Sequence, residues 1–585
     1  KALSLKPDYA EAYYNMGNAL RAQGKIDDAI NAYNKVISLK PNSSEAYHNI
    51  GNALQNKGKL EEAIDAYSKA ISINPDYAEV YNNMGNALKD QGKIGESIKA
   101  FKKALSIKHD FAEAYKNLGH ALQGIVFNKP NRDLQKTIFS ILEKETYIRP
   151  KDIAKAAISL LKLEPSLQKH IQLVNADVTE SPLEVISDIN EFPLLLKLMS
   201  VCPLPDLEVE KLLQKLRRSI LSNLSSLKEA SVELLRFQSA LALQCFTNEY
   251  IYNYTADEEK ILKLLEASVK KTLKNNQQPS SQVLLSLASY KALHKYDWCN
   301  LLVVTDNVKE VFTRQIEEPN QEERLKQDLP ILEEITDSIS SEVRAQYEES
   351  PYPRWVNLGL TIKPFSIPEV VNRINLRLHN SKITKVQEPE ILIAGCGTGQ
   401  HSIGTAARFK GSKVLAIDLS LSSLAYAKRK TDELGIENIK YMQADILDLN
   451  KLNKQFDVIE SAGVLHHMDN PMAGWKVLAD CLKPDGLMCI GLYSELSRQH
   501  IVEAREEISK LGIGANDSEM RSLRDIIINS AKDHHKIIKI SRDFYSLSTL
   551  KDLLFHVQEH RFTIPQIKGH LEKLGLKFCG FESQN

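Results

Sequence analysis

The pattern of hydrophobic and polar positions in the first part of the chain repeats every 34 residues. One unit reads AEAYYNMGNALRAQGKIDDAINAYNKVISLKP, and close copies follow it. In each copy a glycine (Gly24, Gly58 or Gly92) marks the end of a first helix, and a proline such as Pro41 ends the second because it lacks a backbone donor. Residues 1–124 are therefore expected to form stacked pairs of helices.

This unit resembles the tetratricopeptide repeat (TPR), with three full copies and the first helix of a fourth. The resemblance implies a superhelix whose concave groove is lined by polar positions of the first helices. Asparagines occupy such positions in two rows, one of Asn15, Asn49, Asn83 and Asn117 and one of Asn18, Asn52 and Asn86. Because an amide both donates and accepts hydrogen bonds, we predict a groove that binds a protein or peptide partner. The alternative is that these asparagines only stabilise the repeats.

Residues 125–339 lose this period but keep a helical pattern. Apolar residues fall at i, i+3 and i+4 in segments such as VELLRFQSALALQCF and EEKILKLLEASVKKTL. Proline-containing joints such as CPLPDL separate these segments. We predict a helical connector region, and its sequence suggests no role.

From about residue 385 the pattern changes to short apolar runs that alternate with amphipathic helices. The runs are EILIAG, KVLAID, IKYMQA, FDVIES and LMCIGLY. This alternation predicts an α/β domain with a parallel sheet, which binds ligands at the carboxyl ends of its strands.

Glycines and carboxylates fall where these predicted strands end. The first strand runs into Gly395, Gly397 and Gly399, and small residues there let the backbone approach a bound nucleoside. Asp418 ends the second strand, where a carboxylate accepts hydrogen bonds from ribose hydroxyls. Asp445 ends the third strand, within reach of an adenine amino group.

The ordered motifs from the glycine loop to LKPDG resemble the class I S-adenosylmethionine-dependent methyltransferases, over residues 340–585. The resemblance implies a Rossmann-like fold and S-adenosyl-L-methionine as cofactor. It assigns cofactor binding to Gly395, Gly397, Gly399, Asp418, Asp445, Ile446 beside the adenine, and Glu460 beside the methyl donor. Ile393 departs from the family, since many members carry an acidic residue there. An NAD-dependent enzyme is disfavoured, because Gln400 replaces the third glycine of the dinucleotide fingerprint.

Candidate acceptor residues follow the fourth and fifth strands. His466 or His467 is expected to hold or deprotonate an acceptor, and Tyr493 to contact it. Residues 494–564 form a helical insertion of the kind that sets acceptor specificity in this superfamily. A last helix and a strand, LKFCGFE, complete the chain, and we expect the natural protein to continue beyond it.

The segment YEESPYPRW, residues 347–355, precedes the glycine loop. Its prolines preset an extended path and its aromatic residues are able to close over a nucleoside. It is expected either to form a lid over the pocket or to pack as a strap on the sheet.

The order of parts resembles bacterial fusion proteins: an all-α TPR superhelix, a helical middle region and a class I methyltransferase domain. This architecture predicts methyl transfer to an unknown acceptor, with the TPR array recruiting a protein partner or substrate. The alternative is an interaction or scaffold protein whose methyltransferase-like domain is inactive.

The amino-acid composition limits which ligands and which cellular compartment are expected. Lys and Arg number 75, as do Asp and Glu, so the formal net charge is zero and nucleic acid is an unlikely ligand. The seven cysteines form no CxxC pair, and His534-His535 has no acidic partner pattern nearby, so no metal site is expected. No apolar run is long enough for a membrane span. We predict a cytoplasmic protein.

Overall fold

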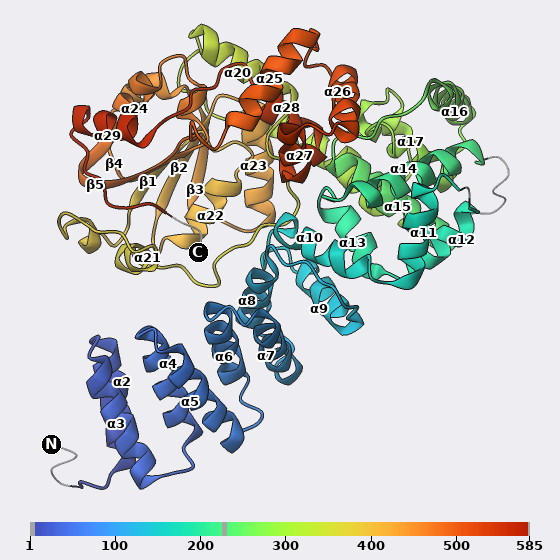
Figure 1. The fold of residues 1–585 in the computed structure, drawn as a ribbon. Helices are drawn as coiled ribbons and strands as arrows, with labels where there is room; N and C mark the ends of the chain where they lie inside the picture. The colour runs from blue at the N-terminus through green and yellow to red at the C-terminus, as the bar shows by residue number, and fades with distance from the viewer. Residues whose placement is uncertain (1–5, 179, 225–230, 583–585) are drawn as a thin grey trace. The chain divides into compact units, whose positions relative to one another are not determined.

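The computed structural model describes residues 6–178, 180–224 and 231–582 of the 585-residue chain. Two compact units make up the chain, Lys1–Leu160 and Leu161–Asn585. Figure 1 shows the helices of the first unit in blue and the sheet of the second in yellow and orange. Within the described residues, no helix combines the length and the apolar character that crossing a membrane requires.

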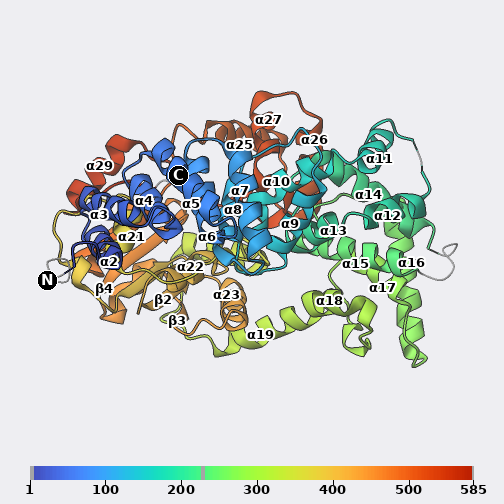
Figure 2. The same cartoon turned by 90° about the horizontal axis from the view of Figure 1, so that it is seen from below.

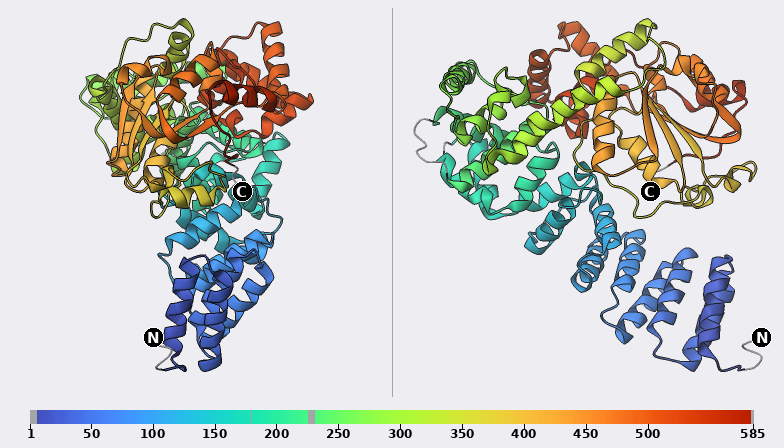
Figure 3. Two further views of the ribbon diagram at one scale, coloured as in Figure 1. Left: turned by 90° about the vertical axis from the view of Figure 1, so that its left-hand side faces the viewer. Right: turned by 180° about the vertical axis from the view of Figure 1, so that it is seen from behind.

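The first unit consists of helices that pack in consecutive pairs (Figure 3). They are α2 (Ala10–Ala22), α3 (Ile26–Leu39), α4 (Ser44–Asn56), α5 (Leu60–Ile73), α6 (Ala78–Asp90), α7 (Ile94–Ile107), α8 (Ala112–Leu122), α9 (Arg132–Leu142) and α10 (Pro150–Leu161). A Cβ at Gly17 would lie 2.5 Å from the ring of Tyr33, so the glycine of a first helix makes room for the aromatic ring of the second. Gly51 and Tyr67 repeat this contact.

The second unit begins with helices that bury a core of their own. They are α11 (Pro165–Asn175), α12 (Pro182–Asn190), α13 (Pro193–Val201), α14 (Leu207–Ser222), α15 (Val232–Thr247), α16 (Ala256–Lys274), α17 (Ser281–Ala288), α18 (Lys309–Phe312), α19 (Glu318–Asp328) and α20 (Ser338–Glu349). Helix α15 is buried along most of its length and packs against α12, α13 and α17. This explains why its sequence is apolar on more than one face.

A five-stranded parallel sheet with order β3-β2-β1-β4-β5 forms the centre of the α/β region. Its strands are β1 (Glu390–Ala394), β2 (Lys413–Asp418), β3 (Ile439–Gln443), β4 (Phe456–Ala462) and β5 (Leu482–Gly491). Helices α21 (Ile367–Arg373), α22 (Gln400–Arg408), α23 (Leu421–Glu433) and α24 (Pro471–Asp480) belong to the same region. Each face of the sheet carries a buried apolar cluster, which accounts for the continuous apolar runs in the strands. The predicted Rossmann-like fold is confirmed.

The helical insertion starts and ends at one place beside the sheet. Its helices are α25 (Gln499–Leu511), α26 (Asp517–Asn529), α27 (Asp533–Ile540) and α28 (Leu547–Phe555), and α29 (Ile564–Lys573) follows. Ser494 and Phe562 form a bridge, and the Phe562 amide donates to the Tyr493 carbonyl at 2.9 Å. The strand predicted for LKFCGFE is wrong: the described residues there form no strand, and the Cys579 carbonyl accepts from the Arg377 amide of a loop instead.

The middle helices are bonded to both the insertion and the α/β region that contains the sheet. Arg524 of α26 donates to both carboxylate oxygens of Glu210 on α14, at 2.5 and 2.6 Å, and both side chains are buried. Helix α19 packs against α23, where Arg429 pairs with Glu322 at 2.8 Å (Figure 2). Residues 161–339 therefore lie in the same compact unit as the sheet.

Candidate functional site

The glycine loop lies between β1 and α22, next to the point where the strand order changes direction. Gly395, Gly397 and Gly399 have φ angles of 78°, 50° and 87°, in the left-handed region that favours glycine. A Cβ at Gly397 would lie 2.7 Å from the carbonyl oxygen of Tyr352. Both the backbone path and the close approach therefore require glycine there.

Asp418 ends β2 directly beside this loop. Its carboxylate accepts hydrogen bonds from the amides of Gly397 at 2.7 Å and Ser420 at 3.0 Å. Burial raises the pKa of the carboxyl group. The structure thus brings together the loop and the carboxylate that the sequence singled out, and leaves part of the acceptor capacity of Asp418 unused by these two bonds.

Asp445 and Ile446 lie at the end of β3 and are both buried. The Asp445 carboxylate accepts from the Leu447 amide at 3.0 Å and so caps a short helix, and burial raises its pKa. The edge of β3 is covered here, because the Leu332 amide donates to the Gln443 carbonyl at 2.9 Å.

Glu460 lies near the end of β4 with its carboxylate turned toward side chains of α22. It accepts from His401 at 2.8 Å, Thr405 at 2.5 Å and Arg408 at 2.5 Å. Burial opposes ionisation, but the hydrogen bond from His401 and the charge of Arg408 lower the pKa of Glu460 to about 2. The side chain is an anion with three protein partners.

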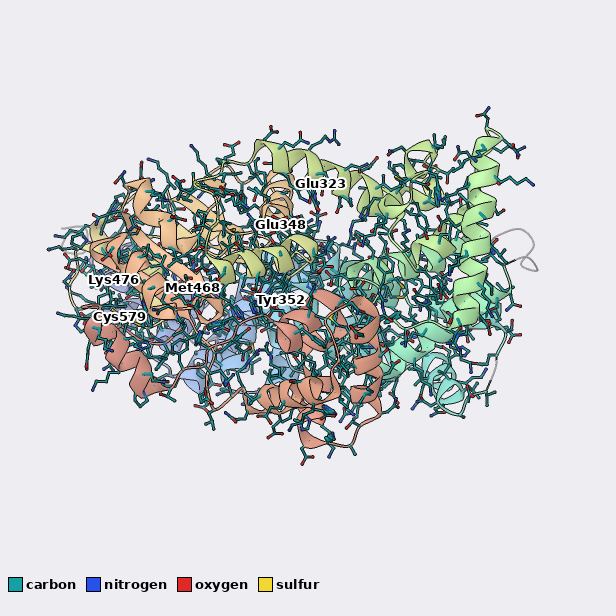
Figure 4. The ribbon with its side chains drawn as sticks, turned by 90° about the horizontal axis from the view of Figure 1, so that it is seen from above. Glu323, Glu348, Tyr352, Met468, Lys476 and Cys579 are labelled. Atoms are coloured by element: carbon teal, nitrogen blue, oxygen red, sulfur yellow. The ribbon has the colours of Figure 1, made fainter. Side chains whose placement is uncertain are left out.

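Residues 348–355, called the strap below, pack on the glycine loop and on the start of α23, and their role as a lid stays a prediction. Glu348 accepts from the amides of Leu421 at 2.6 Å and Ser422 at 3.1 Å, which caps the start of α23. The Trp355 indole donates to the Thr398 carbonyl at 3.0 Å, and the Thr398 amide donates to the Tyr352 carbonyl at 3.4 Å. Figure 4 labels Glu348, in the last turn of α20, and Tyr352, which follows that helix.

The predicted acceptor residues form a cluster of stacked rings. His466 stacks on Tyr493 with ring centroids 3.8 Å apart, and His467 stacks on His556 at 3.5 Å. His467 donates through Nδ1 to the Gln558 carbonyl at 2.7 Å, which leaves Nε2 as an acceptor. Burial lowers the pKa of His466 to about 2 and of His467 to about 4, so both imidazoles are neutral at pH 7. Neither nitrogen of His466 has a partner among the described residues.

Three further residues of this cluster were not assigned to the acceptor site from the sequence. The Tyr347 hydroxyl donates to Asp552 at 2.7 Å and lies 3.1 Å from Nε2 of His556. Burial raises the pKa of Asp552 to about 6. The sequence feature that pointed to two of them was the i, i+4 spacing of Asp552 and His556 in the insertion, because this spacing places two side chains on one side of a predicted helix.

The asparagine rows of the first unit bond to one another across repeats. Two bonds join the rows of successive repeats: Asn49 Nδ2 donates to Asn18 Oδ1 at 3.3 Å, and Asn83 Nδ2 donates to Asn52 Oδ1 at 2.9 Å. Asn117 Nδ2 donates to Asn82 Oδ1, which lies outside both rows, at 2.9 Å. Asn15 is exposed and Asn86 is half-buried. These amides stabilise the stack of repeats, and their binding of a peptide stays a prediction.

Comparison with known proteins gives matches to both regions. A methyltransferase domain family matches residues 391–486, and TPR repeat families match residues 17–58, 55–92 and 85–125, and residues 1–31. The uncharacterized protein syc1184_c of Synechococcus sp. (strain ATCC 27144 / PCC 6301 / SAUG 1402/1) is 27% identical over 273 residues, which cover 43% of this chain and 62% of that protein. The chain thus spans less than two thirds of that relative.

The ubiquinone biosynthesis O-methyltransferase of Rickettsia canadensis (strain McKiel) is 30% identical over 169 residues, 28% of this chain and 68% of that enzyme. Among solved structures, MamA is 27% identical, with a TM-score of 0.21, over 29% of this chain and 86% of MamA. Both resemblances read from the sequence are confirmed. The chain belongs to the class I methyltransferases, and in it TPR repeats precede the methyltransferase domain.

Proposed function

We propose that the second unit transfers a methyl group from S-adenosyl-L-methionine to an acceptor held beneath the helical insertion. The observation that carries this proposal is the contact of Asp418 with the amide of Gly397, inside a loop whose three glycines all have positive φ. Such a loop admits a nucleoside, and the unused acceptor capacity of Asp418 fits ribose hydroxyls. Asp445 and Ile446 would lie toward the adenine, and Gly395, Gly399 and Glu460 would complete the donor site.

The acceptor side would be formed by His466, His467 and Tyr493. When bound, the cofactor supplies a methyl group that is already activated on a sulfonium sulfur. The protein then has to place a nucleophile in line and receive its proton, and holding the two reactants together contributes much of the rate. Nε2 of His467 would accept a hydrogen bond from the acceptor and so orient it. Because the pKa of this ring is lowered to about 4, the released proton would pass on to water rather than stay on His467.

A hydroxyl group is the first acceptor to test. The Rickettsia relative is named as an O-methyltransferase. Nε2 of His467 and the ring nitrogens of His466 are potential hydrogen-bond acceptors, which would suit an acceptor that carries a hydroxyl group.

Calorimetry of the full chain with S-adenosylhomocysteine tests the donor site. Asp418→Ala should weaken binding by about 1–3 kcal/mol, because hydrogen bonds to a charged acceptor are lost. Asp480→Ala, which removes an exposed carboxylate that pairs with Lys476, is the matched control and should leave affinity unchanged. Absence of binding at millimolar ligand in a folded sample would favour the scaffold alternative, in which the domain is inactive.

We further propose that the TPR array recruits a protein partner or substrate. The first test is Asn15→Ala, because Asn15 is exposed and its loss leaves the bonds between repeats intact. It should reduce methylation of a macromolecular acceptor and leave turnover of a small acceptor unchanged. The double variant Asn49→Ala, Asn83→Ala also removes bonds between repeats. If only this variant loses activity, and loses helical content with it, the asparagine rows stabilise the array and do not bind.

A further inference from the structure

A second cluster of ionisable side chains joins two helices of the insertion. Glu503 and Glu507 lie one turn apart on α25, and His534 and His535 begin α27. Oε2 of Glu507 lies 3.2 Å from Nε2 of His534 and 3.5 Å from Nε2 of His535. Three potential metal-ligand atoms therefore face one another, all within 4.8 Å.

These separations fit the coordination shell of a zinc-class ion. With metal–nitrogen and metal–oxygen bonds of about 2.1 Å, neighbouring ligands of a tetrahedral site lie about 3.4 Å apart. The two nitrogen–oxygen distances, 3.2 and 3.5 Å, bracket that value. The rings of His534 and His535 are tilted by 69°, so their in-plane lone pairs are able to converge on one point.

Groups around the three ligand atoms hold them in place. Nδ1 of His534 lies 3.2 Å from a carboxylate oxygen of Glu503, the arrangement in which a metal-bound histidine donates its other ring proton to a carboxylate. Lys532 pairs with the second oxygen of Glu507 at 2.7 Å, which leaves Oε2 directed at the histidines. His535 is 2% exposed, and its Nδ1 has no partner in the described part of the chain.

The other trio of potential ligands, His467, Asp552 and His556, lacks this geometry. The rings of His467 and His556 are stacked 3.5 Å apart with only 17° between their planes. Lone pairs in two nearly parallel planes do not meet on one ion. Nδ1 of His556 also accepts from the Gln558 amide, which places the ring proton on Nε2.

We propose that Glu507, His534 and His535 bind a divalent transition metal of the zinc class, with a fourth position open to water. The ion would join α25 to α27 and so stabilise the insertion. This site is independent of the donor and acceptor residues of the proposed methyl transfer. An imidazole-rich set with one carboxylate suits zinc or cobalt better than magnesium or calcium.

Cobalt and zinc titrations of the chelator-treated full chain test the proposal. One equivalent of Co²⁺ should give the visible absorption of a four-coordinate ion, and Zn²⁺ should displace it. His534→Gln and Glu507→Gln should each lower the affinity at least about 100-fold. Glu503→Gln, at an exposed position that makes no contact with the ion, should lower it about 10–100-fold. His109→Gln, an exposed histidine in the repeats, is the matched control and should bind as the unmodified chain does.

Circular dichroism and tryptophan fluorescence of each variant would establish that it is folded. The proposal is overturned if the unmodified chain takes up no stoichiometric Co²⁺ or Zn²⁺. It is equally overturned if Glu503→Gln and Glu507→Gln bind like the control, or if binding is lost only in His556→Gln.

Discussion

Replacing Gly397 by alanine should destabilise the second unit far more than the same change at an open glycine. Gly397 has φ of 50°, and its new Cβ would lie 2.7 Å from the Tyr352 carbonyl oxygen. That oxygen belongs to the backbone, so no side-chain rotation relieves the contact. Gly435→Ala is the matched control, because Gly435 has φ of 65° and nothing within 4 Å of its Cβ position.

The difference between the two variants follows from the contacts of the strap. Left-handed backbone costs alanine about 1–2 kcal/mol, and both variants share this cost. Gly397→Ala must in addition displace residues 352–353, which weakens the bonds from the Thr398 amide to Tyr352 and from the Thr398 hydroxyl to Pro353. At about 0.5–1.5 kcal/mol per bond, it should lose a further 1–3 kcal/mol or so.

Urea unfolding followed by tryptophan fluorescence measures this difference. All three tryptophans, Trp298, Trp355 and Trp475, lie in the second unit, so the signal reports on that unit alone. S-adenosylhomocysteine binding should also weaken in Gly397→Ala and stay unchanged in Gly435→Ala. Equal free energies of unfolding for the two variants would refute the reasoning that the strap and the loop are in close contact.

Two further predictions concern buried charges. Arg524→Met leaves the Glu210 carboxylate buried without its partner and should lower the free energy of unfolding by about 3–5 kcal/mol in the same urea titration. The double variant Arg524→Met, Glu210→Leu should recover much of this loss, and no recovery would contradict the inference that the two side chains stabilise the fold as a pair. Burial raises the pKa of Asp552 to about 6, above its value of about 4 in the unfolded chain. Between these two pKa values the native state retains a proton that the unfolded chain releases. The free energy of unfolding therefore falls as the pH rises from about 4 to about 6 and beyond. Asp552→Asn should therefore change stability little at pH 4 and increase it by about 2–3 kcal/mol at pH 7.5, and an equal effect at both pH values would contradict this.

Features that follow from a repeating sequence pattern or from the order of the strands could be predicted from the sequence. The repeats follow from a local pattern, and the contact of Asp418 with Gly397 follows from the rule that parallel strands end at one edge of a sheet. The bond between Asn49 and Asn18 was not predicted, because the 34-residue step aligns Asn49 with Asn15 rather than with Asn18, and a bond between the two rows depends on how the helices pack.

Features that depend on packing between distant helices could not be predicted. His534 and His535 have no acidic neighbours of the right spacing along their own helix, and Glu507 reaches them from α25. Asp552 meets Tyr347 across some two hundred positions of chain. The segment LKFCGFE has the local pattern of a strand, but its backbone bonds to the amide of Arg377 in a loop, and its contact with β5 is between the side chains of Glu582 and Cys489.

The bridge between Ser494 and Phe562 makes the insertion an exchangeable cassette. Because the chain leaves and rejoins the sheet region at one point, the helices between can lengthen, shorten or be replaced without moving β1 to β5. The sequence of the insertion can then change while the glycine loop and Asp418 keep their places. The constraint on such exchange comes from the middle helices, because a replacement that lacks Arg524 leaves Glu210 buried without a cation unless Glu210 changes with it.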